Sequence, residues 1–517
     1  MIESGIEKQS EYQISSAVLS NSGRNNDISF DIKNLISSFQ IFEHIEKPYL
    51  TAEFNVVDNV NLIQGYDFQG GEKLTIDIVQ SEERNDGKSV IKEFLIDRIE
   101  EVTRADEVVD SMVFHCIEYH SFKSSLQNIS RSYTGTTGSI ITKIMSEYLD
   151  RDLLTLGDEG TGDIKVIIPN LNPIEAAMWL KNRSVSEIGM PYYIFSVLGA
   201  DNLVMKDLGT ILSEPIMNKD VPFIYAPSVT SNTIHHQQHY NIMEFKISET
   251  EDLHSLIGDG LVGGEYYYYN TMTAAPYRVK YDVEETFRDL SAADLLGGEN
   301  DRFVYAPDYK LNDKKISTYN ARSITQIASS GAYTTATRKF KSYNEESDAA
   351  SHKKKIIAKA MRSFLAKSPI EITVKGREFL TGDNNYTIGR IIRVLFIDTA
   401  SSAENEAQLM FDTKKSGDYV ICAAKHVFAE EAYTTTLLCG RLGILGEETG
   451  IAWVKCFMVI KIDGSLVSSL MSMIRLNSIV LKLEYKVYTH RTLHWYLTQI
   501  YHGHKLQYQW LKEEVQV

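Results

Sequence analysis

The sequence predicts an α+β fold that is mainly β, with two antiparallel β-barrels, an α/β region inserted between them and a C-terminal extension. Two blocks, residues 28–122 and 346–445, alternate apolar and polar residues between turn-rich segments, as strands with one buried face do. Between them, residues 123–215 change to the 3.6-residue period of amphipathic helices. After Gly446 the composition changes again, because residues 446–517 hold three of the four tryptophans, Trp453, Trp495 and Trp510.

Composition limits the class of protein. The chain has 517 residues, of which 43% are hydrophobic and 24% charged, so it can form roughly two to four domains with ordinary cores. Its formal net charge of -16 disfavours a nucleic-acid binder that grips phosphates through a basic face. We see no run of about 18 apolar residues that would span a membrane. The N-terminus lacks a basic-then-apolar pattern, so we expect synthesis and folding in a cytoplasm.

The N-terminal part divides into an arm and a barrel. Residues 1–27 are polar and predict a flexible arm. The barrel, residues 28–122, has a predicted hairpin tip at Asn85-Asp-Gly87. Its predicted strands are Asp27–Ile32, Ser37–Glu43, Leu50–Val57, Lys73–Gln80, Ser89–Ile99 and Ser111–Tyr119.

The small α/β domain, residues 123–215, has two predicted helices. Ser139 is expected to cap the first, Ser139–Leu149. The second starts at Asn172-Pro173, a cap followed by proline, and runs to about Ser186. Its apolar stripe is Ile174, Ala177, Met178 and Leu180–Lys181, and a hairpin follows from Pro191–Leu198 and Asn202–Lys206.

Two less regular parts follow. Residues 216–250 are expected to return the chain to the second barrel through a strand within Asn241–Glu249. Residues 251–345 contain the run Tyr266–Tyr269 and several glycine-rich turns, which predict an irregular insertion of paired strands and long loops.

Residues 346–445 predict a basic helix that leads into the second barrel. One helix face carries Ile356, Ile357, Ala360, Met361, Phe364 and Leu365, and the opposite face carries Lys353, Lys354, Lys355, Lys359 and Arg362. Ser368-Pro369 ends the helix, because proline disfavours helical geometry before it. The predicted strands are Ile370–Val374, Thr387–Ile397, Gln408–Phe411, Tyr419–Phe428 and Ala432–Leu438.

The C-terminal extension, residues 446–517, has no evident role. Ile451–Ile462 and Ser478–Tyr488 predict strands, and Ser465–Leu476 predicts a short apolar helix. His490 and His494 would share a face of a helix, the spacing that metals use, and His502 and His504 lie nearby. No glutamate stands between the first two, so packing or surface histidines are favoured over a metal site.

We predict no catalytic, cofactor-binding or metal-binding residue. Gly135–Ser139 could hold an anion at a helix start, but capping of the helix explains it. His235, His236 and His239 lie in a polar loop, and Cys116, Cys422, Cys439 and Cys456 form no CxxC pair and are expected to be buried. Tyr266–Tyr269 could stack sugars, although an interface strand is favoured. Lys353–Lys355 fits a solvated helix face or an acidic neighbouring subunit.

With these parts in place, the chain resembles the baseplate hub protein of contractile-tailed bacteriophages, whose fold recurs in the type VI secretion spike. The resemblance covers about residues 28–445, with gaps in 216–345. It rests on Phe42–Phe54, Gly70–Ile76, Phe114–Tyr119, Pro169–Leu180, Met190–Phe195, the basic helix, Ile372–Gly376, Leu380–Gly382 and the strands up to Leu438.

The resemblance implies a non-enzymatic virion protein of the contractile tail, made in the host cytoplasm. Each subunit would supply two barrels that resemble a tail-tube subunit. Three subunits would then form a homotrimeric ring of pseudo-sixfold symmetry that adapts the hexameric tail tube above to the trimeric central spike below. Baseplate wedge proteins would surround the ring, and double-stranded DNA would pass through its lumen during ejection without specific binding. The net charge of -16 adds the hypothesis that the lumen wall is acidic, so that it repels the DNA and lets it slide.

Two other classes of function remain open. A cell-wall hydrolase carried at the tail tip would need an acid/base pair in a cleft, and residues 251–345 offer the room for one. A receptor- or glycan-binding tail-tip module would use Tyr266–Tyr269 and the tryptophan-rich extension.

Overall fold

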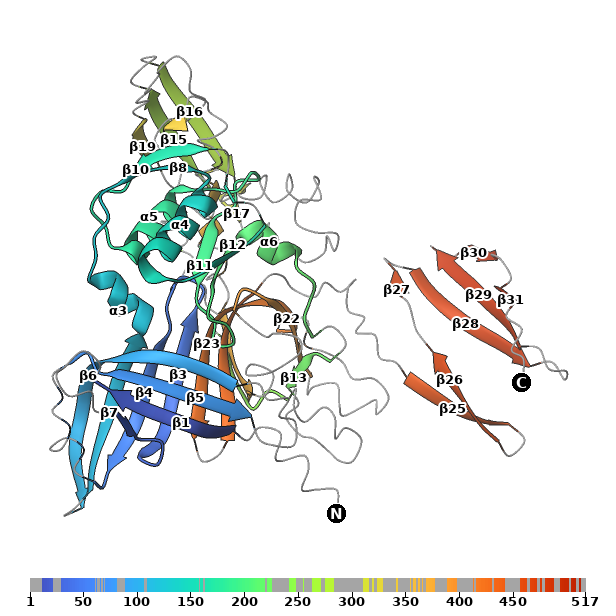
Figure 1. Cartoon of the computed structure of the whole chain (residues 1–517). Helices are drawn as coiled ribbons and strands as arrows, with labels where there is room; N and C mark the ends of the chain where they lie inside the picture. The colour runs from blue at the N-terminus through green and yellow to red at the C-terminus, as the bar shows by residue number, and fades with distance from the viewer. Residues whose placement is uncertain are drawn as a thin grey trace.

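A computed structural model gives the fold, which is dominated by one large sheet (Figure 1). The described residues are 12–21, 29–60, 70–80, 89–106, 109–157, 163–218, 221–225, 241–247, 263–270, 275–282, 310–315, 323–328, 369–376, 388–397, 415–429, 432–441 and the strands between 456 and 512, with single residues and pairs between these ranges. The sheet has 13 strands in the order β14-β21-β24-β23-β3-β4-β7-β6-β5-β1-β2, with β13 and β22 attached beside this path. The two predicted strand blocks are therefore parts of one sheet.

The first block confirms its predicted strands. They are β2 (Ser29–Asp31), β3 (Ile36–His44), β4 (Thr51–Asp58), β5 (Lys73–Gln80), β6 (Ser89–Asp106) and β7 (Val109–Glu118). All neighbours in this block are antiparallel. The Ile32 amide donates to the Ala17 carbonyl, and the Val57 amide donates to the Leu35 carbonyl, so the turn after β2 leads directly into β3. The predicted tip Asn85–Gly87 lies outside the described residues.

The predicted N-terminal arm is wrong over part of its length. Tyr12–Ser20 forms β1, which pairs with β2 and β5. Ala17 and Leu19 are fully buried. A register shift between Ile14 and Ser16 breaks the two-residue alternation, which explains why the segment reads as polar and irregular in the sequence.

The second block also confirms most of its predicted strands. It comprises β21 (Pro369–Lys375), β22 (Ile391–Phe396), β23 (Gly417–Ala429) and β24 (Ala432–Arg441). β22 starts later than predicted, because Gly389 adopts a left-handed φ of 74° in a turn just before it. As predicted, the 216–250 segment returns to this block: β14 (Glu244–Ile247) pairs with β21, and β13 (Phe223–Tyr225) pairs with β22. The predicted strand Gln408–Phe411 lies outside the described residues.

The basic helix is described at residues 354, 357, 358, 361 and 362. Ile357, Met361 and Leu365 are buried, as predicted, and Ala358 joins them. Arg362 is half-buried, although the sequence places it on the solvent face. Lys353, Lys355 and Lys359 lie outside the described residues.

The α/β unit follows β7 as expected. Its helices are α3 (Tyr119–Ser125), α4 (Thr137–Leu149), α5 (Pro173–Arg183) and α6 (Leu208–Ser213), and its strands are β8 (Ser132–Gly135), β9 (Leu153–Leu156), β10 (Ile164–Ile167), β11 (Tyr192–Phe195) and β12 (Leu203–Asp207). β11 and β12 form the predicted antiparallel hairpin. Asn172 and Glu175 form a complete capping box at α5. The predicted cap of α4 is wrong: Thr136 accepts from the Ser139 amide, because Thr136 is the last extended residue before the helix.

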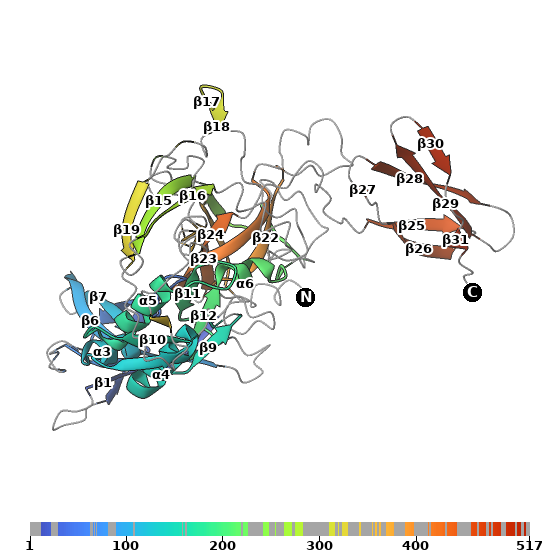
Figure 2. The same ribbon diagram turned by 90° about the horizontal axis from the view of Figure 1, so that it is seen from above.

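The insertion contains β15 (Gly263–Asn270), β16 (Ala275–Asp282) and β19 (Ser323–Ala328) in one sheet. The hairpin of β17 (Lys310–Leu311) and β18 (Lys314–Lys315) projects from the upper edge of Figure 2. β20 (Lys341–Ser342) pairs with β10. Paired strands are thus present in residues 251–345, as predicted.

The C-terminal extension is β-structured over its described residues. β25 (Cys456–Ile462) pairs with β26 (Ser465–Met471), and a second sheet holds β27 (Arg475–Leu476), β28 (Ile479–Val487), β29 (Leu493–Tyr501), β30 (His504–Gln507) and β31 (Leu511–Lys512). The predicted helix Ser465–Leu476 is wrong: Leu466, Val467, Leu470 and Met471 fall at helical spacing by chance in a strand. His494 lies on β29, so a helical pair with His490 does not form; His490 itself is outside the described residues.

Two hydrophobic cores organise the rest of the molecule. The larger core includes Phe39 and Phe54 of the first block together with Val420 and Phe428 of the second. The smaller core lies in the α/β unit, around Ile141 of α4 and Leu180 of α5. Because the two blocks share both a sheet and a core, they form one packing unit.

Candidate functional site

The two blocks meet along β23, which changes its partner halfway. Residues 417–420 pair with β22, whereas residues 423–429 pair with β3 of the first block. At Cys422 the register with β24 shifts, and the Ile45 amide donates to the Cys422 carbonyl at 2.8 Å. A bulge leaves one residue unpaired and bends its strand, so β23 can belong to both blocks.

Four aromatic rings cross this junction in register, and we call them the aromatic ladder. Phe54, Phe39, Phe428 and Tyr433 are successive cross-strand neighbours on β4, β3, β23 and β24. The ring centroids are 5.4 Å apart for Phe54–Phe39, 4.3 Å for Phe39–Phe428 and 4.3 Å for Phe428–Tyr433, and all three pairs are stacked. Each such pair contributes about 0.5–1.5 kcal/mol beyond its buried area. The ladder therefore ties the blocks together.

Tyr12 of β1 closes one side of the ladder. Its ring meets Phe39 edge-on at 5.9 Å and Phe428 at 5.0 Å between centroids. The segment predicted as a flexible arm thus contributes a side chain to the junction.

A buried ion pair fastens the α/β unit to the first block. Arg151 Nη2 donates to Glu118 Oε1 at 2.8 Å, and the two side chains are 3% and 5% exposed. Glu118 Oε2 accepts from the Leu50 amide at 2.9 Å. Ser196 adds a hydroxyl that contacts both charged groups. Each charge is compensated, which a buried ion pair requires in order to be tolerated.

A second buried polar group lies beside the aromatic ladder. The Glu43 carboxylate accepts from the Leu198 amide of the α/β unit. His426 Nε2 lies 3.6 Å from Glu43 Oε2, and His426 Nδ1 lies 2.7 Å from the Tyr433 hydroxyl. Burial raises the pKa of the Tyr433 hydroxyl well above 10.0, so the phenol stays protonated. This chain of contacts links both blocks to the α/β unit.

A third group joins the α/β unit to the basic helix. Lys181 is 0% exposed, and its Nζ donates to Glu46 Oε2 at 2.6 Å, with the Glu46 side chain 40% exposed. Arg362 Nη2 donates to the Lys181 carbonyl at 3.5 Å. The helix approaches β24 so closely that a Cβ at Gly440 would collide with the Leu365 carbonyl oxygen.

Stability should depend on pH through Lys181. Burial lowers the pKa of this ammonium group from 10.5, and Glu46 opposes the shift. Between the folded pKa and 10.5 the unfolded chain binds more protons, so stability rises with pH in that window. The unfolding free energy of wild type minus that of Lys181→Met is therefore expected to increase from about pH 7 to about pH 10 in denaturant titrations.

The matched control for this prediction is Lys165→Met, because Lys165 is exposed on β10. The unfolding free energy of wild type minus that of Lys165→Met should stay constant over the same pH range. A constant difference for Lys181→Met as well would show that the buried amine does not titrate in this way.

The described residues include few groups suited to binding a metal ion or acting as a nucleophile. No group of three His, Cys, Asp or Glu side chains among them could hold a metal ion. Cys116, Cys422 and Cys439 are buried, as predicted, and burial raises the pKa of each thiol, to about 12 for Cys422. Thiols of this kind are poor nucleophiles. Within the described part of the chain, no helix is both long and apolar enough to cross a membrane.

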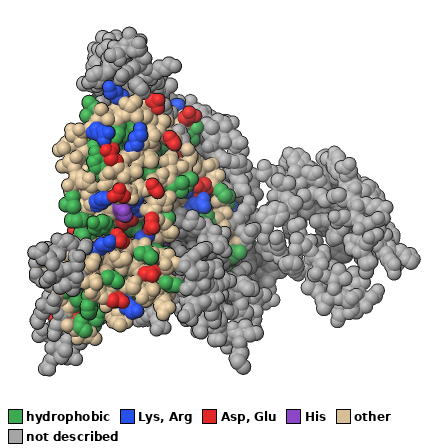
Figure 3. All heavy atoms as spheres, in the orientation of Figure 1, with side chains coloured by type: hydrophobic (Ala, Val, Ile, Leu, Met, Phe, Trp, Pro, Cys, Tyr) green, Lys and Arg blue, Asp and Glu red, His purple; other side chains and the backbone are tan. Residues whose placement is uncertain are grey.

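The other residues considered from sequence are dispersed. Gly135–Ser139 caps α4, and the Glu159 carboxylate accepts from the Thr136 hydroxyl there at 3.1 Å, so an acid occupies the helix start. Tyr266–Tyr269 lies on β15, which pairs with β16 and β19, and its place at an interface stays a prediction. His235, His236 and His239 lie outside the described residues. Figure 3 shows side chains of both charge signs interspersed over the described part of one face.

Comparison with known proteins gives structural matches only. No protein-family model matches the sequence, and no curated protein matches it either. A tail protein from Neisseria meningitidis is 11% identical with a TM-score of 0.45, over 84% of this chain and 98% of that one. The 43 kDa tail protein of a Shewanella oneidensis prophage is 12% identical with a TM-score of 0.45, over 82% and 98%.

A third match comes from a secretion system. It is an Escherichia coli component of type VI secretion, described as similar to bacteriophage T4 tail proteins, with 6% identity and a TM-score of 0.36 over 97% of this chain and 94% of that one. The chain is thus similar in structure to phage tail proteins and to a type VI secretion component.

Proposed function

We propose that this chain is a structural hub of a contractile phage tail and has no catalytic role. Three copies form a ring of pseudo-sixfold symmetry, which joins a hexameric tail tube to a trimeric central spike and surrounds the DNA channel. Each strand block acts as one tube-like module. Wedge proteins of the baseplate would contact the outside of this ring.

The joined sheet is the observation that carries the proposal. A ring that presents six modules from three chains needs two modules in each chain, held at a fixed relation. The shared strand β23, the aromatic ladder and the common core provide such a relation. The sequence resemblance of residues 28–445 to hub proteins points to the same role.

The sheet also has edges suited to contacts between copies. From β14 to β6 there are eight strands, each antiparallel to the next, so β14 and β6 run in opposite directions. Among the described strands, none pairs with the outer edge of β14, nor with β6 beyond Leu95 on the side away from β7. Exposed strand edges of this kind pair readily with another chain.

Charge suggests the register of that contact. Glu100 on β6 and Lys246 on β14 are exposed, and Ile99 and Ile247 pack inward beside them. Antiparallel pairing of β6 with β14 of the next copy can place Glu100 opposite Lys246 and Ile99 opposite Ile247. Opposite charges and apolar pairs on matching faces favour this alignment.

A charge-reversal experiment tests the ring. Sedimentation of the full chain over a concentration series is expected to reveal a trimer, and Lys246→Glu should weaken it by roughly tenfold, because like charges then face each other. The double variant Lys246→Glu/Glu100→Lys should restore it. Lys165 is exposed on β10, away from both strand edges, so Lys165→Glu should leave assembly of the trimer unchanged.

Two results would contradict the proposal. One is a chain that stays monomeric at every concentration and shows no rings in electron micrographs. The other is release of fragments from peptidoglycan that a single carboxylate substitution abolishes, since this would establish a hydrolase.

A further inference from the structure

The sheet of the insertion presents a polar and aromatic face. β15 pairs with β16 antiparallel and with β19 parallel, and Figure 1 shows this sheet at the opposite end of the molecule from the β6–β7 hairpin. Tyr281 of β16 is 2% exposed and packs into the larger core, which fixes the base of the sheet. Side chains alternate along a strand, so Pro276, Arg278 and Lys280 share the other face, and all three are exposed.

On that face the ring of Tyr267 is held in one position. Tyr267 is 38% exposed and is the cross-strand partner of Arg278. Its hydroxyl donates to Glu265 Oε2 at 3.1 Å, and the Arg278 guanidinium lies 5.8 Å from the ring centroid. Arg278 Nε donates to Glu265 Oε1. A half-exposed tyrosine that is tied at both the hydroxyl and the ring loses little freedom on binding a ligand.

The charges of this face favour an anion. The Arg278 and Lys280 side chains are exposed, whereas Glu265, the cross-strand partner of Lys280, is 3% exposed. The hydrogen bond from Arg278 lowers the pKa of the Glu265 carboxyl, so this partner stays ionised and keeps the guanidinium in place. An arginine held in this way can present its remaining N–H groups to a second carboxylate.

We propose that the Tyr267, Arg278 and Lys280 face binds an acidic carbohydrate. The tyrosine ring would pack against the apolar face of a sugar ring, and the two cations would bind its carboxylate or equivalent acidic group. A neutral sugar lacks the anion, and an acidic peptide lacks the flat ring face. The proposal goes beyond the hub role and does not depend on ring assembly.

Three polymers distinguish these possibilities when binding to the full chain is measured by calorimetry: polygalacturonate, dextran and polyglutamate. Polygalacturonate is expected to bind at least tenfold more tightly than either of the others. Tyr267→Ala should weaken that binding about tenfold, the scale of one aromatic contact. Tyr267→Phe should keep most of the affinity, because the ring remains.

The matched control is Tyr319→Ala, which removes a surface tyrosine beneath Lys314, 4.8 Å from its ring, outside this sheet. The affinity of Tyr319→Ala for polygalacturonate should equal that of wild type. The proposal is overturned if polygalacturonate does not bind, if polyglutamate or dextran binds equally well, or if Tyr267→Ala binds like wild type. A thermal melt of each variant separates loss of the site from loss of the fold.

Discussion

Phe428→Ala is expected to lower the free energy of unfolding by about 3–5 kcal/mol, the range for truncating a well-packed aromatic side chain. Phe428 is 0% exposed, and its ring contacts Phe39, Tyr433 and Tyr12. The substitution leaves a cavity at the boundary between the blocks and breaks the aromatic ladder in its middle. Denaturant unfolding of the purified chain measures the loss.

The position of the cavity gives this prediction a second readout. Hydrogen exchange should increase in both β3 and β24 of Phe428→Ala, since both strands border the missing ring. Phe94→Ala removes an equally buried ring of the first block and should affect that block alone. Equal exchange changes in the two variants would mean that the ladder does not couple the blocks.

Glu118→Ala is expected to cost about 3–5 kcal/mol, because removal of one partner leaves the buried Arg151 charge uncompensated. The substitution also removes the acceptor of the Leu50 amide. Thermal and denaturant unfolding should both show the loss. The double variant Glu118→Leu/Arg151→Met should recover much of it, since no buried charge then remains.

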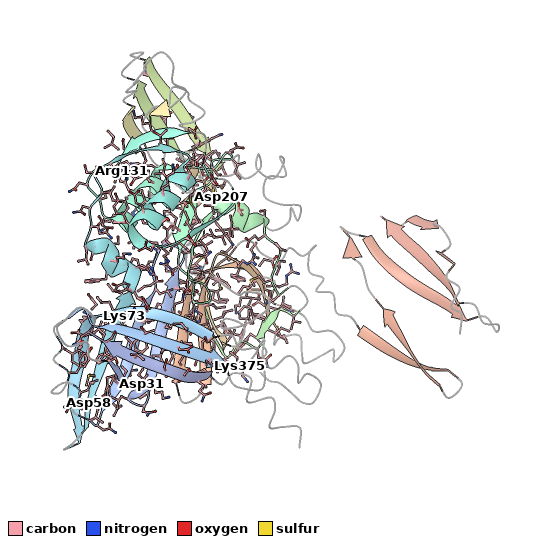
Figure 4. All side chains as sticks on the ribbon, in the orientation of Figure 1. Asp31, Asp58, Lys73, Arg131, Asp207 and Lys375 are labelled. Atoms are coloured by element: carbon pink, nitrogen blue, oxygen red, sulfur yellow. The ribbon has the colours of Figure 1, made fainter. Side chains whose placement is uncertain are left out.

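An exposed ion pair in the same unit serves as the control. Arg131 and Glu147 lie 2.5 Å apart, with side chains 57% and 46% exposed, and Figure 4 labels Arg131 on the outside of the unit. Glu147→Ala should change stability by much less than Glu118→Ala does, because solvent screens an exposed ion pair. A comparable loss in the two single variants would show that burial does not govern the Glu118 pair.

Most of the strands can be predicted from the sequence because apolar and polar residues alternate along them without interruption. In β3, Phe39, Ile41 and Glu43 are buried and alternate with less buried residues, and the predicted strand Ser37–Glu43 differs from β3 by one residue at each end. The sequence does not predict β1, because its register shift separates the apolar residues Ile14 and Ala17 by three positions. A local irregularity that pairing tolerates thus removes the signal on which the prediction depends.

The contacts that join the two strand blocks and the α/β unit can be predicted from the sequence only in part. Glu43 continues the inward series Phe39 and Ile41, and Glu118 continues the series Phe114 and Cys116, so a buried carboxylate could have been predicted at both places. The groups that these two carboxylates contact could not have been predicted. Arg151 follows Glu118 by 33 residues, and pairing of β3 with β23 joins segments hundreds of residues apart, which no local pattern encodes.

The bulge at Cys422 has a geometric consequence. Ile421 and Ala423 pair with the consecutive residues Cys439 and Leu438, so deleting Cys422 would keep residues 423–429 on their present faces and in register with β24, and would remove the bulge together with its bend. The bend of β23 where it passes from one block to the other therefore depends on one unpaired residue.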